Sequence, residues 1–217
     1  MKSSLSPVRR EKTFGLRERN KLDKLHRIKE AATELFMQKG FDDTTTRAIA
    51  LRAGVGLGTV FVYAPTKRDL LFLIINEELQ AVVDRSAGLV QNSRSMLDNL
   101  LRVFRAHYRY FGQRPALSRL VLREMVFYAA GPEAKKYLHT RERLIALIGD
   151  VVTLAVEQKE IAPHEDAKLV AWVIFSIYQI EIRHWLSSDN LDITKGVDFL
   201  KRQLVLLKDG LSSRSAD

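Results

Sequence analysis

The chain of 217 residues is long enough for one large or two small domains, and its 46% apolar and 28% charged residues are typical of globular proteins. It has no cysteine, which excludes disulfide frameworks, thiolate metal sites and cysteine nucleophiles and fits a cytoplasmic location. The net charge is +9, and nearly all of the excess lies in residues 1–68, which hold 15 basic and 7 acidic side chains. This asymmetry favours a polyanionic partner, either nucleic acid or an anionic membrane surface.

We expect neither a secretory signal nor a membrane span. No apolar segment follows the basic N-terminus. The longest uncharged apolar run, residues 169–180, has 12 residues, whereas a bilayer span needs roughly 20. Peripheral membrane binding by the basic N-terminus is disfavoured as well, because that segment lacks an apolar stripe.

The chain is predicted to be all-α. Apolar residues at three- and four-residue spacing predict one helix that ends at Gly40 and two short helices between residues 46 and 63. A long helix then runs from Thr66, whose spacing to Asp69 suits a capping box, to about residue 90. Further helices are expected at about 94–113, 115–128, 132–158, 165–187 and 192–209. No segment alternates with a period of two for long enough to predict a strand.

The window from Thr46 to Tyr63, TRAIALRAGVGLGTVFVY, has the spacing of a helix-turn-helix. Ala50 is small enough for two short helices to cross closely, and Gly54 can adopt the positive φ of a sharp turn. Six residues beyond the turn glycine, Val60 would face back into the contact. The glycine-rich run also suggests a nucleotide-binding loop, but a helix precedes it instead of a strand and no Gly-Lys-Ser/Thr follows.

Residues 25–75 resemble the N-terminal domain of the tetracycline-repressor (TetR/AcrR) family. The matching stretch is AATELFMQKGFDDTTTRAIALRAGVGLGTVFVYAPTKRDLL. It contains the family's first helix ending in Gly-Phe, a Thr-rich cap, Ile-Ala-x-x-Ala-Gly-Val at the turn, Gly-Thr, an aromatic cluster and Pro-Thr-Lys. The resemblance implies a homodimeric, ligand-responsive transcriptional regulator, usually a repressor, with a palindromic operator in double-stranded DNA and a divergent C-terminal effector domain.

The resemblance also assigns DNA contacts. The threonine cap and Arg47 would lie near phosphates, the second short helix would meet base edges in the major groove, and Lys67 would bind phosphate. The assigned residues are Thr45, Thr46, Arg47, Leu57, Gly58, Thr59, Phe61, Val62, Tyr63 and Lys67. As alternatives, the two aromatics could be core residues and the two basic side chains solvated charges.

Three positions depart from the family pattern. Gly56 replaces the usual N-cap serine, Phe61 the usual phosphate-contacting tyrosine and Ala64 a common aromatic. Together with Leu57 and Val62, they leave the recognition helix poor in hydrogen-bond donors. We therefore expect specificity from thymine methyl contacts, backbone positioning and DNA shape.

The C-terminal part predicts a dimer. A heptad-like seam on the last helix is formed by Ile193, Val197, Leu200, Leu204 and Leu207. The preceding helix is apolar on nearly all sides and must be covered on two faces. Two such helices from each subunit would form a four-helix interface, as the resemblance also implies. Burial of the seam inside a monomer is the alternative.

Aromatic and polar groups on the middle helices are candidates for the lining of an effector pocket that takes a hydrophobic or aromatic compound. They are Phe104, His107, Tyr108, Phe111, Met125, Phe127, Tyr128, Trp172, Phe175 and Tyr178. A helical core has a similar pattern, so a core role is the alternative for each of them.

No enzyme is predicted, because the histidines lack metal-ligand spacing and no Gly-x-Ser-x-Gly elbow occurs; neither a metal nor a cofactor is expected. We divide the chain into a basic flexible arm (1–17), a DNA-binding domain (18–66), an effector-binding and dimerisation domain (67–211) and a tail (212–217). The arm would reach a minor groove or stay unbound. The alternative function is a helical protein-interaction adaptor that has lost DNA binding.

Overall fold

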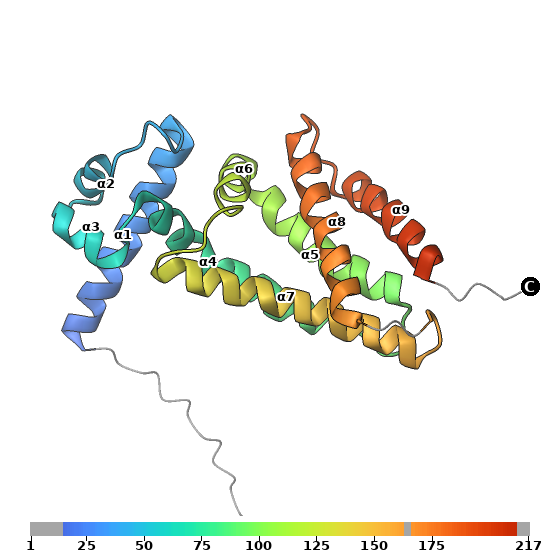
Figure 1. The fold of residues 1–217 in the computed structure, drawn as a ribbon. Helices are drawn as coiled ribbons and strands as arrows, with labels where there is room; N and C mark the ends of the chain where they lie inside the picture. Colours follow the sequence, from blue (N-terminus) through green and yellow to red (C-terminus); the bar gives the residue numbers. More distant parts are fainter. Residues whose placement is uncertain (1–14, 163–165, 212–217) are drawn as a thin grey trace, which may run out of the picture.

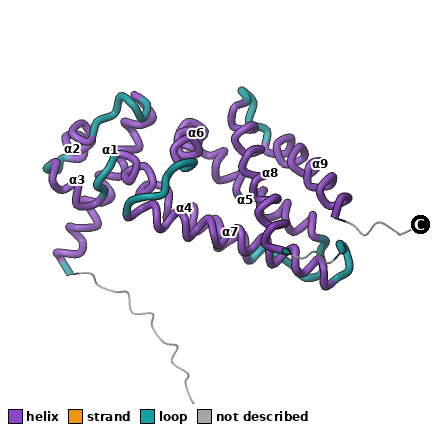
Figure 2. Tube along the Cα trace, viewed as in Figure 1, coloured by secondary structure: helices purple, strands orange, loops and turns teal. Residues whose placement is uncertain are grey.

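The computed structural model describes residues 15–162 and 166–211, which form nine helices and no strand (Figures 1 and 2). The all-α prediction is confirmed. The helices are α1 (Leu16–Lys39), α2 (Thr46–Ala53), α3 (Leu57–Tyr63), α4 (Lys67–Ala87), α5 (Met96–Gln113), α6 (Pro115–Glu124), α7 (Pro132–Glu157), α8 (Ala167–Ser187) and α9 (Ile193–Leu211). Among these, no helix is long and apolar enough to cross a membrane.

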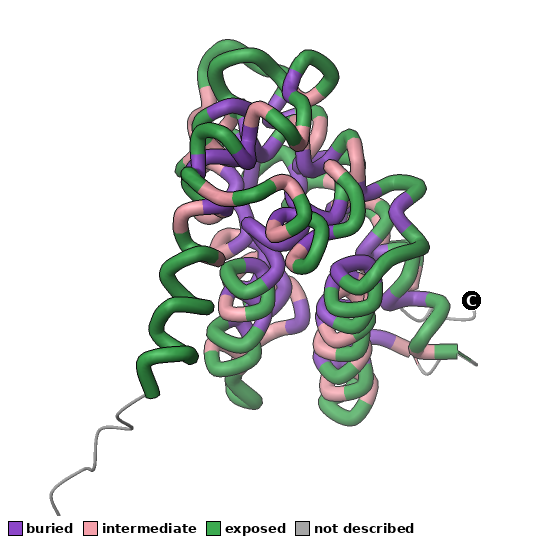
Figure 3. Tube along the Cα trace, turned by 90° about the vertical axis from the view of Figure 1, so that its left-hand side faces the viewer, coloured by how far each residue is buried: buried purple, intermediate pink, exposed green. Residues whose placement is uncertain are grey.

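Helices α1, α2 and α3 form a small unit at one end of the molecule (Figure 1). Its core joins Ile28 and Phe36 of α1 to Ile49 of α2 and Val60 of α3, all of them buried. The sequence pattern does not reveal the first turns of α1, because residues 16–24 are exposed and carry no apolar periodicity (Figure 3).

That early start corrects the predicted arm. Arg17, the last residue of the flexible arm predicted for residues 1–17, lies in the first turn of α1. The remaining part of the predicted arm, residues 1–14, and the predicted tail, residues 212–217, lie outside the described residues.

The six remaining helices form the body, in which α4 and α7 run side by side (Figure 1). α4 is common to both parts, since it packs against α1 as well as against α5 and α7. Buried Asn76 of α4 donates hydrogen bonds to the backbone oxygen and a carboxylate oxygen of Glu133 of α7, at 3.0 and 2.8 Å. α8 covers α7, and α9 packs against α5 and α8.

Helix α6 is shorter than predicted, because it ends at Glu124 rather than near residue 128. The chain then reaches α7 through Gly131, whose φ of 114° suits glycine. A Cβ at Gly131 would overlap the carboxylate of Asp69, which is buried and accepts hydrogen bonds from the hydroxyls of Thr66, at 2.7 Å, and Tyr128. The loop after α6 is thereby fixed to the first turn of α4.

Candidate DNA interface and effector cavity

The helix-turn-helix has the local geometry that its sequence predicts. The Thr45 hydroxyl accepts a hydrogen bond from the Ala48 backbone N–H at 3.1 Å, which caps α2. Gly54 adopts the left-handed conformation, with φ 62° and ψ 40°, and ends α2. Arg27 of α1 supports this turn by donating to the Ala53 carbonyl at 3.0 Å. The angle between α2 and α3 is thus fixed by local caps and by one side chain of α1.

Helix α3 presents one buried and one exposed face. Val60 is fully buried against the other two helices, whereas Val62 is 82% exposed and Phe61 44% exposed. Gly58 is exposed, and a Cβ at that position would meet no atom within 4 Å. No side chain caps the N-terminus of α3, which begins at Gly56. The exposed face is therefore smooth and apolar, with few hydrogen-bond donors.

A basic groove flanks this exposed face. Arg17, Lys21 and Lys24 of α1, with one acidic residue, Glu18, line it together with Gly58, Thr59, Val62 and Tyr63 of α3. Neither lysine is among the DNA contacts that the sequence assigns, although the spacing of 17, 21 and 24 places all three basic residues on one helical face. Their positive charge beside α3 suits a phosphate backbone next to a groove-reading helix.

Two predicted DNA contacts have partners inside the protein. The Tyr63 hydroxyl donates to the Lys21 carbonyl of α1 at 2.9 Å, so this aromatic positions α3 against α1. Lys67, in the first turn of α4, donates to the Asp42 carbonyl at 3.0 Å and lies 4.6 Å from the ring centre of Phe41. Since an ammonium has three donors, this one hydrogen bond does not exhaust it.

A small cavity of about 20 Å³ lies inside the body. Its walls come from α4, α5, α7 and α8 and from Met125, which follows α6. The lining residues are Leu79, Val83, His107, Phe111, Met125, Tyr137, Thr140, Arg141, Leu144, Phe175, Tyr178 and Gln179. The cavity is lined mainly by apolar and aromatic side chains, as in sites for apolar ligands, but it is much smaller than the roughly 300 Å³ at the lower end for such sites.

One pair of polar groups on the cavity wall is fully buried. The hydroxyl of Tyr178 lies 3.0 Å from Nδ1 of His107. Burial lowers the pKa of His107 to about 4, because the apolar surroundings disfavour the imidazolium. Burial likewise raises the pKa of Tyr178, and neighbouring Tyr108 adds to that effect. Both groups are therefore neutral at pH 7.

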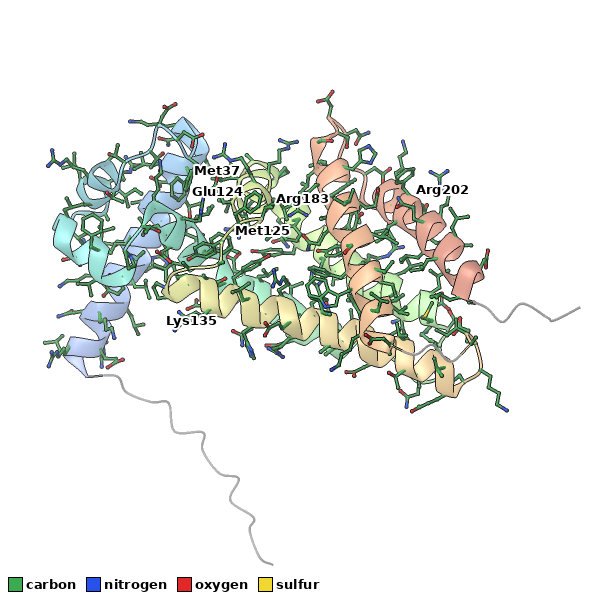
Figure 4. All side chains as sticks on the ribbon, in the orientation of Figure 1. Met37, Glu124, Met125, Lys135, Arg183 and Arg202 are labelled. Atoms are coloured by element: carbon green, nitrogen blue, oxygen red, sulfur yellow. The ribbon has the colours of Figure 1, made fainter. Side chains whose placement is uncertain are left out.

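Ion pairs link the end of α6 to the α1–α3 unit and to the first turn of α4. Arg123 pairs with Asp42 of the α1–α2 loop at 3.2 Å, and Glu124 pairs with Arg68 of α4 at 2.9 Å. The next residue is Met125 of the cavity wall. Figure 4 labels Glu124 and Met125 near the end of α6, between the α1–α3 unit and the body. Arg123, Glu124 and Met125 are consecutive in the chain and therefore connect the cavity wall to the α1–α3 unit and to α4.

Residues 28–74 match a family model described as bacterial regulatory proteins, tetR family. The chain is 28% identical to the HTH-type transcriptional repressor KstR of Mycobacterium tuberculosis, over 87% of this chain and 81% of that protein. It is 20% identical to the fatty acid metabolism regulator protein of Bacillus subtilis, over 79% and 88%. Residues 28–74 are therefore a DNA-binding domain of the TetR type. The relatives are transcriptional regulators and not enzymes, and this chain is a DNA-binding transcriptional regulator.

Solved structures of TetR-family proteins share the fold. The Thermus thermophilus FadR repressor in complex with lauroyl-CoA aligns with a TM-score of 0.64 and 24% identity, covering 88% of this chain and 97% of that one. The Bacillus subtilis regulator FadR in complex with stearoyl-CoA aligns with a TM-score of 0.68 and 20% identity, covering 83% and 97%.

The cavity brings together five of the ten residues that the sequence suggests for an effector pocket: His107, Phe111, Met125, Phe175 and Tyr178. Phe104 is buried behind them and stacks on Tyr178 with ring centres 4.6 Å apart. Sequence reasoning missed the contributions of α4 and α7, because their apolar residues, such as Leu79 and Leu144, look like ordinary core positions.

The other four suggested pocket residues do not line this cavity. Phe127 is 87% exposed, since α6 ends before it and helical periodicity no longer sets its direction. Trp172 of α8 is half exposed, with the Arg141 guanidinium of α7 5.9 Å from its ring centre. Tyr108 is buried against Trp185, with ring centres 4.9 Å apart. Tyr128 stacks on Phe72 at 4.0 Å and donates to Asp69.

The residues of the predicted dimer seam on α9 pack mainly inside the protomer. Val197, Leu200 and Leu204 are buried within the protomer, where α9 packs against α5 and α8, while Ile193 and Leu207 are partly buried. The periodicity correctly indicates a packing face, but the partner helices belong to the same chain. The exposed apolar residues of α8 and α9 are Leu169, Trp172, Val173, Ile180, Phe199 and Leu206.

Proposed function

We propose that this regulator is a repressor of the TetR family that binds a palindromic operator as a homodimer and is released by an apolar effector in the body cavity. The observation that carries the proposal is the exposed face of α3 beside the basic groove of Arg17, Lys21 and Lys24. Recognition helices of this class enter the major groove while neighbouring basic residues hold the phosphates. Relatives named as repressors support the sign of regulation.

The proposed DNA-binding domain comprises residues 18–66. Leu57, Gly58, Thr59, Phe61 and Val62 would approach base edges, and Thr45, Thr46, Arg47, Tyr63 and Lys67 would contact or position the backbone. The exposure of Val62 and Phe61 supports readout through thymine methyl groups and DNA shape. If Leu57→Ala and Val62→Ala each leave the preferred DNA sequence unchanged, this mode of readout is wrong.

The proposed second domain, residues 67–211, dimerises through the outer faces of α8 and α9. Ile180 and Leu169 of α8, and Phe199 and Leu206 of α9, are apolar and exposed in the single chain. The rings of His184 and Phe199 lie 5.7 Å apart, so the two helices present a continuous face there. Two copies of this face would bury the apolar surface. Analytical ultracentrifugation at micromolar concentration tests the dimer.

We further propose that the effector is an acyl thioester of coenzyme A. The FadR proteins in complex with lauroyl-CoA and stearoyl-CoA support this class, as does the apolar lining of the cavity. An acyl chain needs more room than about 20 Å³ and would displace side chains of the wall. Met125 is the flexible member of that wall nearest to α6.

The proposed release mechanism is a population shift. A ligand that prefers an expanded cavity would move the end of α6, and with it Arg123 and Glu124, which pair with Asp42 and Arg68. α4 provides a second connection, because it carries both cavity residues and Lys67. Operator affinity would fall by the ratio of the ligand's affinities for the two states.

The first test is selection of bound duplexes from a random DNA library, followed by a salt titration on the selected operator. Enrichment of a palindrome, with log affinity falling steeply against log salt, is the expected result. If Lys21 and Lys24 each neutralise one phosphate, Lys21→Ala and Lys24→Ala should each reduce the salt slope by about 0.9. Arg94→Ala is the matched control, because Arg94 lies just before α5 in the body and not in the α1–α3 unit. At that point the Met96 backbone N–H donates to the carboxylate of Glu160.

Absence of enrichment at low salt, with folded protein, would overturn the proposed binding of a specific operator and favour the adaptor. If the selected operator is not released by lauroyl-CoA, the effector class is wrong while the proposed operator binding stands.

A further inference from the structure

The cavity wall contains two polar atoms without a hydrogen-bond partner. They are Nε2 of His107 and Nε of Arg141, and both are buried. Three other polar groups of the same wall have partners within the protein. The Thr140 hydroxyl donates to the Lys136 carbonyl at 3.0 Å, the Gln179 side-chain oxygen accepts from Arg183 at 2.7 Å, and Tyr137 hydrogen-bonds the Arg141 side chain, whose Nε is left without a partner. A buried polar atom that lacks a partner is costly and calls for a specific explanation.

Hydrogen-bond accounting decides which nitrogen of His107 carries the proton. If the Tyr178 hydroxyl donates to Nδ1, the proton lies on Nε2 and only that N–H lacks a partner. If Nδ1 donated instead, the Tyr178 hydroxyl proton and Nε2 would both lack partners. The first arrangement leaves one unsatisfied group and the second leaves two, so Nε2–H is the favoured donor.

The imidazole is well suited to hold this donor. His107 is only 1% exposed, and its pKa of about 4 keeps it neutral, so Nε2 presents a single N–H rather than a charge. Tyr178, stacked on Phe104 and bonded to Nδ1, fixes the ring orientation. Arg141 contributes a second N–H to the same cavity. The wall is otherwise mostly apolar, so these two donors mark where an oxygen atom is recognised.

We propose that His107 Nε2–H and Arg141 Nε–H bind the carbonyl oxygen of the effector's acyl group, and that this contact selects acyl compounds over hydrocarbon chains of equal length. The proposal rests on the effector class given above and adds the ligand atom that the protein recognises, the acyl carbonyl oxygen. A thioester carbonyl and a free carboxylate both offer such an oxygen. Tyr178 is a positioning residue, because it acts through the imidazole.

The test uses two ligands that differ by one oxygen. Lauroyl-CoA has a thioester carbonyl, whereas S-dodecyl-CoA has a methylene in its place. Calorimetry with the full chain should show S-dodecyl-CoA binding about tenfold more weakly, the equivalent of one hydrogen bond. Dodecanoate is the third ligand: binding as tight as that of lauroyl-CoA or tighter assigns the site to a carboxylate, whereas a dodecanoate affinity that His107→Leu leaves unchanged assigns it to the thioester.

Variants of the donors separate recognition from packing. His107→Leu should lower the affinity for lauroyl-CoA about tenfold and change the affinity for S-dodecyl-CoA little. His107→Gln keeps an N–H near Nε2 and should restore most of the affinity for lauroyl-CoA. Arg141→Lys keeps the charge but lacks the Nε–H, so it should weaken the binding of lauroyl-CoA and leave that of S-dodecyl-CoA unchanged. Leu144→Ala is the packing control, since it should change the affinities for both CoA ligands by the same factor. Thermal unfolding of each variant monitors folding.

Equal affinity of the two CoA ligands, or equal losses for both in His107→Leu, would overturn the inference while leaving the acyl-CoA class intact. Absence of binding by lauroyl-CoA would overturn the effector class and this inference together. An independent result comes from the free protein: ¹⁵N spectra of the histidine side chains should show the neutral Nε2–H form for His107 at pH 7. The Nδ1–H form would contradict the proposal.

Discussion

At the scale of single residues, burial of His107 makes stability depend on pH. Its pKa is about 4 when folded and about 6.5 when unfolded, so the unfolded state binds more protons between these values. The contribution is fully present above pH 6.5 and is lost as the pH falls toward 4. We expect the free energy of unfolding to drop by about 2 kcal/mol between pH 7 and pH 5 from this group.

Urea unfolding followed by circular dichroism at fixed protein concentration measures this drop. His107→Gln removes the titrating group, and its drop over the same interval should be smaller by about 2 kcal/mol. An unchanged pH dependence in His107→Gln would show that other groups cause it.

Residue roles that depend on near neighbours were predictable, and those that depend on distant ones were not. The Thr45 cap and the left-handed Gly54 involve partners within four residues, and the sequence alone predicts both. The capping-box spacing of Thr66 and Asp69 predicts the contact between these two residues but not the second partner of Asp69. Asp69 accepts from the Thr66 hydroxyl and also from Tyr128, 59 residues away, which no local pattern specifies.

At the scale of helices, α9 approaches its neighbours through a glycine. A Cβ at Gly196 would lie 2.6 Å from Cδ1 of Trp185 and 2.7 Å from Cε1 of Tyr108. Gly196→Ala should therefore destabilise the fold by about 2 kcal/mol through overpacking. Gly210→Ala on the same helix is the matched control, because nothing lies within 4 Å of its Cβ, and it should be neutral or slightly stabilising. Chemical denaturation measures the free energy of unfolding of both variants. Equal stability of Gly196→Ala and Gly210→Ala would contradict the packing argument.

Helix α3 contains a glycine whose presence is not explained by packing. Gly58 lies inside α3, is exposed and would accept a Cβ without contact. Gly58 is the second residue of α3, so alanine there should stabilise the protein by at most the roughly 0.5–1 kcal/mol that applies to exposed helix interiors. If α3 enters the major groove, the same methyl should lower operator affinity. Gly58→Ala is thus expected to raise the melting temperature and weaken DNA binding, and unchanged DNA binding would argue against close approach of this position.

Periodicity predicts the helices well because it records which face of each helix is buried. It does not reveal the partner of that face. The seam of Val197, Leu200 and Leu204 looks the same whether it packs against a second subunit or against α5 and α8 of its own chain. Exposure in the folded chain separates the two cases, and it moves the proposed dimer face to Ile180 and Leu206.

At the scale of the whole molecule, the proposed dimer face makes a clear prediction. Ile180 is 63% exposed, so Ile180→Glu should leave the protomer folded but place two charges in the proposed interface. We expect ultracentrifugation to show a monomer for this variant and a dimer for the unmodified chain. Val126→Glu is the control, since Val126 is similarly exposed but lies in the loop between α6 and α7. A dimer that survives Ile180→Glu would place the interface elsewhere.

The ion pair between Arg123 and Asp42 connects the cavity wall to the DNA-binding unit, and it should carry part of the coupling between effector and operator. An exposed pair is worth at most about 1 kcal/mol, so Arg123→Ala should reduce the effector's influence on operator affinity by up to about fivefold. The quantity to measure is the ratio of operator affinities without and with lauroyl-CoA, rather than either affinity alone. Arg119→Ala is the matched control, because Arg119 lies one turn earlier on α6 and bonds the Leu186 carbonyl of α8.

A double-mutant cycle isolates the pair. If the bond itself transmits the change, Asp42→Asn should reduce the ratio as Arg123→Ala does, and the double variant should lose no more than either single variant. Reciprocity gives a second readout: operator DNA must alter the affinity for lauroyl-CoA by the same factor, and that factor must shrink equally in the variants. Additive losses would mean that the two residues act independently, and α4 would then remain as the path from the cavity to the DNA.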